Sequence, residues 1–97
     1  MLSQIVMVKI KEGTIKEQID ALMKGFAEMV RDIDGMSGQC GLALGIIQVE
    51  PYDFGAITHY GSRAAFDEYL KHPAHKKFGQ TYMLPVVEKL EAVQFEH

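Results

Sequence analysis

The feature that most constrains the fold of this chain is a strand near its start that is apolar on both sides. Side chains of residues Leu2–Ile10 point alternately to the two sides of the strand. One side carries Gln4, Val6, Val8 and Ile10, and the other carries Ile5, Met7 and Lys9. A strand with one face in water would be polar at every second position. We therefore expect a sheet that is covered on both of its faces.

An amphipathic helix is predicted after this strand. Thr14 and Glu17 have the spacing of a capping box, in which side-chain oxygens accept hydrogen bonds from the free amides of the first turn. Apolar residues then recur at steps of three or four, at Ile15, Ile19, Leu22, Phe26, Met29 and Ile33. Gly35 can take the left-handed conformation that ends a helix, so we expect the helix to stop near Asp34.

The middle of the chain predicts two strands of unequal regularity. Residues 40–44 and 45–49 are extended but irregular in pattern, and we expect bulges or close backbone approaches at Gly38, Gly41 and Gly45. Pro51-Tyr52-Asp53 marks a turn. Residues 54–60 alternate more cleanly, which predicts a regular third strand with Thr58 and His59 on opposite faces.

The second helical region is expected to be broken in two. Ser62 is a good N-cap for a helix that runs to Leu70. Pro73 disfavours helical angles at His72 but suits the first turn of a new helix, which we expect over residues 74–84. A last strand is predicted over residues 88–95.

This order of elements predicts the α+β class, as one domain over residues 1–97. Strand, helix, strand, strand, broken helix and strand fit a ferredoxin-like split βαββαβ sheet with both helices on one face. The other face would then be exposed and apolar, which is unusual in a monomer. We expect a second copy of the chain to cover it, in a two-fold homodimer joined sheet against sheet.

Composition excludes several other classes of protein. The net charge of -3 and the pI near 5.7 argue against a nucleic-acid surface, which needs a basic face. No segment approaches the ~20 apolar residues that span a bilayer, and the start lacks the pattern of a signal peptide. The single cysteine, Cys40, excludes an internal disulfide and suits a reducing compartment. We expect a cytoplasmic protein without membrane or nucleic-acid partners, and we give His97 no role.

Residues 67–79 gather the groups most able to move protons near neutral pH. The break at Pro73 could bring Tyr69 and His75 to one pocket, where a neutral imidazole can abstract a proton and a phenol can donate to an oxygen that gains charge. The alternative is structural, with Tyr69 packed in the core and His75 bonded to a backbone carbonyl. For His72, a local capping role is favoured over metal binding, since no third ligand accompanies His72 and His75 except His59.

The chain resembles the stress-responsive A/B barrel (Dabb) domain family of the dimeric α+β barrel superfamily over nearly its whole length. The likeness is carried by Ile5–Lys11 followed by Glu12-Gly13-Thr14, by residues 53–60, by the motif Tyr69-Leu70-Lys71-His72-Pro73-Ala74-His75, and by Val93–Glu96. The resemblance implies a dimer whose sheets form a barrel, with a small cavity between each sheet and its helices. The residues that we assign to binding a ligand there are His72, Phe26, Met23, Leu22, His59 and Tyr82.

The family includes plant polyketide cyclases, which implies a chemistry for the motif. In such a cyclase a His acts as general base for an intramolecular aldol condensation and a Tyr holds the substrate, and the matching positions are His75 and Tyr69. Gly79 and Tyr82 continue the likeness. Two positions depart from it, because Gln4 stands where the family commonly has a His, and Phe26 replaces an aromatic hydroxyl.

Four functions follow from these observations. The first is a homodimeric protein that binds a small carbonyl-bearing or aromatic ligand in an apolar pocket near Tyr69 and His75. The second is a cofactor-free cyclase or lyase with His75 as base and Tyr69 as donor. The third is a purely structural stress-response dimer, and the fourth is a monooxygenase-like protein of the same superfamily. We assign no cofactor and no metal.

Overall fold

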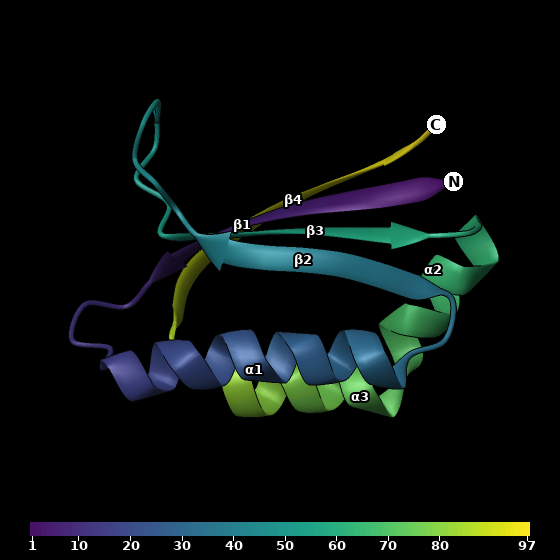
Figure 1. Ribbon diagram of the computed structural model, residues 1–97, viewed down its shortest axis with the longest axis horizontal. Helices are drawn as coiled ribbons and strands as arrows, with labels where there is room; N and C mark the ends of the chain where they lie inside the picture. Colours follow the sequence, from purple (N-terminus) through teal and green to yellow (C-terminus); the bar gives the residue numbers. More distant parts are fainter.

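The computed structural model describes residues 1–97, which form one sheet with helices on one side (Figure 1). The elements in chain order are β1 (Leu2–Ile10), α1 (Lys16–Asp32), β2 (Met36–Leu42), β3 (Phe54–Tyr60), α2 (Arg63–Lys71), α3 (Pro73–Lys77), the π-helix η1 (Phe78–Met83) and β4 (Val87–Glu96). This order confirms the predicted α+β class.

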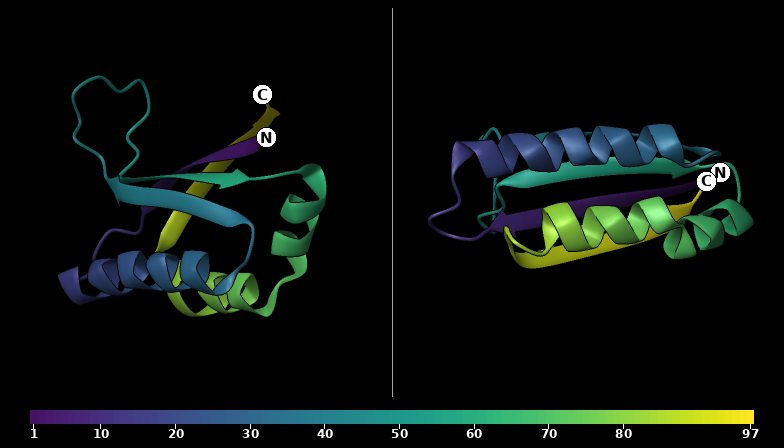
Figure 2. Two further views of the ribbon diagram at one scale, coloured as in Figure 1. Left: turned by 45° about the vertical axis from the view of Figure 1, so that its right-hand side comes forward. Right: turned by 90° about the horizontal axis from the view of Figure 1, so that it is seen from below.

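The four strands form an antiparallel sheet in the order β2-β3-β1-β4, so the first and last strands of the chain lie side by side. The pairing of β1 with β4 shifts once, between Lys9 and Ile10. α1, α3 and η1 lie together against one face of this sheet, and α2 closes one end (Figures 1 and 2). The arrangement is the ferredoxin-like split βαββαβ fold that the pattern of the sequence predicted.

The core lies between the sheet and the helices. Its fully buried members include Val8 of β1, Leu22 of α1 and Tyr60 of β3. The opposite face of the sheet has no helix over it, and it carries Met7, Val93 and Phe95, which are 38%, 53% and 44% exposed. As predicted, the single chain covers one apolar face of the sheet and leaves the other in contact with water.

Two predictions about the second strand were wrong. β2 starts earlier, at Met36, and ends at Leu42, and residues 43–53 form a loop that extends away from the sheet (Figure 2). The pairing of β2 with β3 runs without a shift, so Gly38 and Gly41 are not bulges. The close backbone approach that was also predicted is confirmed at Gly38, because a Cβ there would lie 2.7 Å from the backbone oxygen of Ile57.

The start of α1 also differs from the prediction. α1 begins at Lys16, and Thr14 does not cap it, because its hydroxyl donates to the backbone oxygen of Lys11 instead. The side-chain oxygen of Gln18 accepts from the amide of Ile15 at 3.1 Å and satisfies one free donor of the first turn. At the other end Gly35 adopts the expected left-handed conformation, with φ of 80°.

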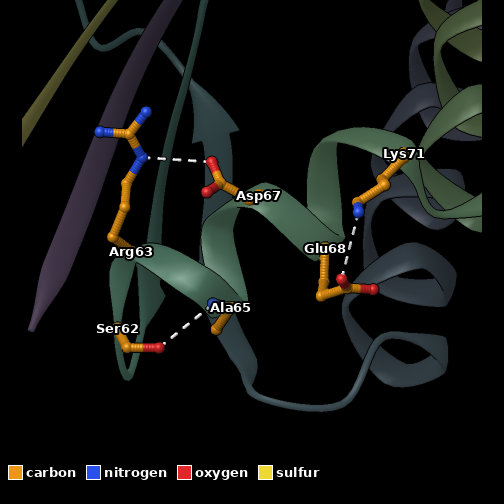
Figure 3. Close-up of polar contacts among 6 residues, drawn as sticks. All are labelled: Ser62, Arg63, Ala65, Asp67, Glu68 and Lys71. Atoms are coloured by element: carbon orange, nitrogen blue, oxygen red, sulfur yellow. Dashed lines mark hydrogen bonds and ion pairs between the residues drawn. The ribbon is translucent and has the colours of Figure 1, made fainter.

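The broken helix follows the predicted chemistry. The Ser62 hydroxyl accepts from the amide of Ala65 at 3.1 Å and caps α2, whose exposed surface carries the ion pairs Arg63–Asp67 and Glu68–Lys71 (Figure 3). His72 ends α2 in an extended conformation, and its Nδ1 accepts from the amide of Ala74 at 3.0 Å, so the predicted capping role is confirmed.

The second helical piece is less regular than expected. After α3, the chain widens into η1, in which the amide of Leu84 donates to the oxygen of Gly79 at 2.8 Å, five residues back. α1, the longest helix, has 17 residues. None of the helices combines the length and the apolar character that crossing a membrane requires.

Candidate functional site

A cavity of about 280 Å³ lies between the sheet and the helices, on the side of α2, α3 and η1. Most of its lining is apolar, and Phe26 and Met29 of α1 and Phe78 of η1 form one side. The volume lies just below the range of ~300–1,000 Å³ that is usual for small-molecule sites. The cavity therefore suits a compact ligand.

The sheet supplies the polar part of the lining at one end. Gln4 of β1 pairs with Thr58 of β3 on one side and with Gln94 of β4 on the other. The side-chain nitrogen of Gln94 donates to the side-chain oxygen of Gln4 at 2.8 Å, so the side-chain nitrogen of Gln4 takes no part in this hydrogen bond. Gln4 is only 7% exposed and lines the cavity, so its amide can act on a bound molecule.

Tyr69 comes from the last turns of α2 and lies in the core beside this polar end. It is 7% exposed, and its ring packs against Tyr60 with centroids 5.0 Å apart. Burial raises the pKa of the Tyr69 phenol, because the charged form loses solvation, and the neighbouring Gln4 and Tyr60 side chains oppose part of that rise. Tyr69 is thus a neutral phenol at physiological pH, with a proton to donate.

His75 comes from α3 and lies against Tyr69. The two ring centroids are 4.2 Å apart, and both side chains line the cavity. His75 Nδ1 is 3.2 Å from the backbone oxygen of Leu70. A carbonyl only accepts, so Nδ1 carries the hydrogen and the lone pair of the neutral ring is on Nε2. The structure brings Tyr69 and His75, the two predicted catalytic residues, to one cavity. It also contains the hydrogen bond between His75 and a backbone carbonyl that the structural alternative predicts.

The break at Pro73 is what makes this geometry. Tyr69 and His75 are six residues apart, and an unbroken helix would place them on different faces. His72 leaves the helical conformation, and its imidazole is occupied by capping α3, so it does not line the cavity. The structure thus separates His72 from Tyr69 and His75.

The other predicted binding residues divide between the cavity and the surrounding core. Phe26 lines the cavity. Leu22 is fully buried and Met23 is half-buried within the core cluster, so both lie behind the lining. Tyr82 packs against Phe78 and over Gly25, where a Cβ would overlap its ring.

His59 is on the other face of the sheet and does not line this cavity. Its partner in the register is Ser3, whose hydroxyl lies 2.8 Å from His59 Nδ1 and 2.8 Å from His97 Nε2. Because neighbouring residues of a strand point to opposite faces, Thr58 lines the cavity and His59 cannot. No group of three His, Cys, Asp or Glu side chains gathers at any point of the structure to hold a metal ion.

Sequence reasoning missed most of the lining that the sheet contributes. Val6, Ala56 and Ala92 lie next to one another across β1, β3 and β4 and form the middle of the cavity floor. The signal was present in the alternation of β1, where Gln4 and Val6 share a face. The pairing of distant strands, which joins Ala56 to Ala92 through Val6, was needed to see it.

Comparison with known proteins agrees with the fold. The sequence profile of the stress responsive A/B barrel domain matches residues 2–97. The stress-response A/B barrel domain-containing protein HS1 of Arabidopsis thaliana is 27% identical over 97 residues, which cover 98% of this chain and 88% of that protein. A crystal structure of an Arabidopsis thaliana protein superposes with a TM-score of 0.88 at 26% identity, covering 100% of this chain and 95% of the other.

Two more distant structures share the fold. A protein of unknown function from Thermobifida fusca, described as dimeric and ferredoxin-like, has a TM-score of 0.87 at 20% identity, over 99% of this chain and 90% of that one. The hydroxynitrile lyase of Passiflora edulis has a TM-score of 0.86 at 18% identity, over 97% of this chain and 90% of that one. The profile match over residues 2–97 establishes that the chain belongs to the stress-responsive A/B barrel domain family.

Proposed function

We propose that this protein is a homodimer that binds a small carbonyl-bearing or aromatic molecule in the cavity beside Tyr69 and His75. The observation that carries the proposal is the contact between these two rings at the wall of an apolar cavity, with a centroid distance of 4.2 Å. A phenol and an imidazole nitrogen there can hydrogen-bond one oxygen of a ligand whose remaining surface is apolar.

Binding can be tested with the methionine methyl groups as reporters. Met29 and Met83 line the cavity, whereas Met7 lies on the opposite face of the sheet. Titration of methyl-labelled protein with acetophenone should shift the NMR signals of Met29 and Met83 and leave that of Met7 in place. Equal shifts at all three methyl groups, or none, would contradict binding in this cavity.

The homodimer is supported by the uncovered face of the sheet and by similar structures that are described as dimeric. Light scattering should give twice the mass of the 10.9 kDa chain at micromolar concentration. Phe95→Glu places a charge on that face and should produce a monomer. Leu84→Glu is the matched control, since Leu84 is 70% exposed and follows η1 on the helical side. A monomeric wild type would refute the dimer.

A cofactor-free lyase or cyclase is the second candidate. The observation in its favour is the bond from His75 Nδ1 to Leu70, because it leaves Nε2 as the unprotonated nitrogen of the neutral imidazole. His75 would take the proton next to a carbonyl, and Tyr69 would donate to the oxygen that gains charge. The Passiflora edulis lyase shares the fold, and its name adds one reaction class to test.

Turnover separates the enzyme from a binding protein. Aldol, retro-aldol and cyanohydrin substrates should be tested with the wild type and with His75→Ala. Loss of turnover in the variant, with acetophenone binding retained, supports the enzyme. If His75→Ala leaves every reaction untouched, the base assignment fails. A sharp drop in Tm alone would favour the structural dimer, and a Soret band on titration with haem would favour the monooxygenase-like protein.

A further inference from the structure

The loop over residues 43–53 stands on the face of the sheet that no helix covers (Figure 1). Its base is fixed, because the amide of Asp53 donates to the backbone oxygen of Val8 at 2.9 Å and a side-chain oxygen of Asp53 accepts from the amide of Ile10 at 2.8 Å. Its large aliphatic side chains have almost no cover within the chain, and each is at least 78% exposed: Leu44, Ile46, Ile47 and Val49. A loop that is held at its base and uncovered at its tip is preorganised for a contact outside the chain.

A groove of about 580 Å³ lies between this loop and the uncovered face of the sheet. Ile47 and Val49 line it from the loop, and its floor includes Met7 of β1 and a pair of glycines. These glycines, Gly41 and Gly55, lie opposite each other on β2 and β3. Neither has a positive φ, and a Cβ would fit at both positions, so the backbone and the packing of the chain do not require glycine. What the missing side chains provide is depth in the groove.

The uncovered face carries an exposed aromatic ring at its other end. Phe95 of β4 pairs with Ser3, whereas Glu91, which lines the groove, pairs with Met7. The four-residue step from Ser3 to Met7 spans about 13 Å, so the ring of Phe95 does not reach the groove of its own chain. The two termini mark the end with Phe95, and the loop marks the opposite end (Figures 1 and 2).

The symmetry of a dimer relates these two ends. A two-fold dimer joined sheet against sheet makes each contact twice, with the two regions exchanged between the copies. If both loops stood at the same end, both would need the space above that end of the sheets. If the copies are stacked end for end, each loop stands over the end of the partner that has no loop. Similar structures are described as dimeric, which favours a second copy over any other occupant of the groove.

We propose that the loop over residues 43–53 is an arm that grips a second copy of the chain, with Phe95 of the partner subunit in the groove under Ile47 and Val49. This inference rests on the proposed homodimer and specifies how the two copies are oriented. The contact occurs twice in each dimer. It removes from water the aliphatic side chains and the ring that the single chain leaves exposed, which is favourable for association.

Disulfide cross-linking tests this orientation. On oxidation, Ile47→Cys/Phe95→Cys should form a covalent dimer, with twice the mass of the 10.9 kDa chain on a non-reducing gel, and each single variant should stay at the mass of one chain. A disulfide within one chain would also leave that mass unchanged. The native Cys40 is common to all variants and lies on the helical face of β2, since it pairs with Ala56 of the cavity floor. A covalent dimer of Ile47→Cys alone would place both loops at one end and overturn the proposal. So would a double variant that is dimeric by light scattering and forms no cross-link.

Serine substitutions in the arm test its contribution without a cross-link. Ile47→Ser and Val49→Ser should each raise the dissociation constant of the dimer about tenfold or more in analytical ultracentrifugation, because a buried aliphatic side chain is lost. Leu84→Ser is the matched control, since it removes an exposed aliphatic side chain on the helical side and should leave this constant unchanged. An unchanged constant in both arm variants overturns the proposal and assigns the loop to another occupant, such as a lipid surface. A monomeric wild type overturns the proposed homodimer itself.

Discussion

The imidazole of His75 lies over the phenol of Tyr69, with ring centroids 4.2 Å apart and planes inclined at 35°. Tyr69 lies in the last turn of α2 and His75 in the first turn of α3, so their contact depends on the turn at His72-Pro73. The two polar tips are held differently, since His75 Nδ1 is bonded to Leu70 while the Tyr69 hydroxyl is next to the cavity and Gln4.

Tyr69→Phe should weaken ligand binding and leave stability nearly unchanged. The ring and its packing remain, and one hydrogen bond to the ligand is lost, which lowers the affinity for acetophenone about 2- to 10-fold. Calorimetric titration measures this. Tyr60→Phe is the control, because the Tyr60 hydroxyl donates to Thr58 at 3.0 Å in the core. That variant should lose about 1–3 kcal/mol of stability in urea unfolding. If Tyr69→Phe kept its affinity for acetophenone and lost stability instead, the ligand would bind elsewhere.

His72→Ala should destabilise the fold by about 0.5–2 kcal/mol, because it removes the cap of α3. His72→Asn keeps a side-chain acceptor at the same position and should recover most of this loss. Urea unfolding at pH 8 measures both variants. Equal losses for alanine and asparagine would show that the ring contributes by packing rather than by accepting from Ala74.

Gly25→Ala should destabilise the protein even though alanine favours helices. The added methyl would overlap the ring of Tyr82 across the contact between α1 and η1. Overpacking of this kind costs about 1–3 kcal/mol, which exceeds the gain in helix propensity of up to ~1 kcal/mol. Thermal unfolding of Gly25→Ala beside Gly79→Ala compares a crowded with an open helical position. A rise in Tm for Gly25→Ala would contradict the close packing.

Stability should fall steeply at alkaline pH. Burial raises the pKa of the phenols of Tyr60 and Tyr69 above the value of about 10 that applies to the unfolded chain. Above pH 10 the unfolded state therefore binds fewer protons than the folded state, so the free energy of unfolding decreases as pH rises. The contribution is complete below about pH 10, and each group adds a slope of up to ~1.4 kcal/mol per pH unit above it. Urea unfolding between pH 8 and 11 should show a shallower decline for Tyr60→Phe than for the wild type.

The regular elements could be predicted because each has a strong local pattern. β3 has the bounds that its alternation indicated, and α2 starts directly after Ser62 as its cap requires. The loop over residues 43–53 could not be predicted in this way. Ile46, Ile47 and Val49 look like strand residues, but they are 78%, 91% and 100% exposed, and no local rule states that apolar residues will remain unpaired.

The site was predictable only in part, for a similar reason. The meeting of Tyr69 and His75 follows from one local event, the helix break at Pro73. The floor of the cavity depends on which residues of β3 and β4 lie beside those of β1, and strand register is not encoded within any one segment. His59 illustrates this limit. The alternation of β3 places His59 and Thr58 on opposite faces of the sheet, but only the packing of the helices determines which face lines the cavity.

The wide turn of η1 is equivalent to one extra residue within a helix. Each residue of an α-helix turns the chain by about 100°, so everything after that turn is rotated by this amount relative to a helix without it. The bond from Leu84 to Gly79 marks the insertion, and Met83, just before Leu84, lines the cavity. Deletion of a single residue between Gly79 and Met83 would restore a regular α-helix, and a different side chain would then take the place of Met83 in the lining of the cavity. A change in chain length, with no substitution at all, is therefore a route by which proteins of this fold can acquire a different cavity.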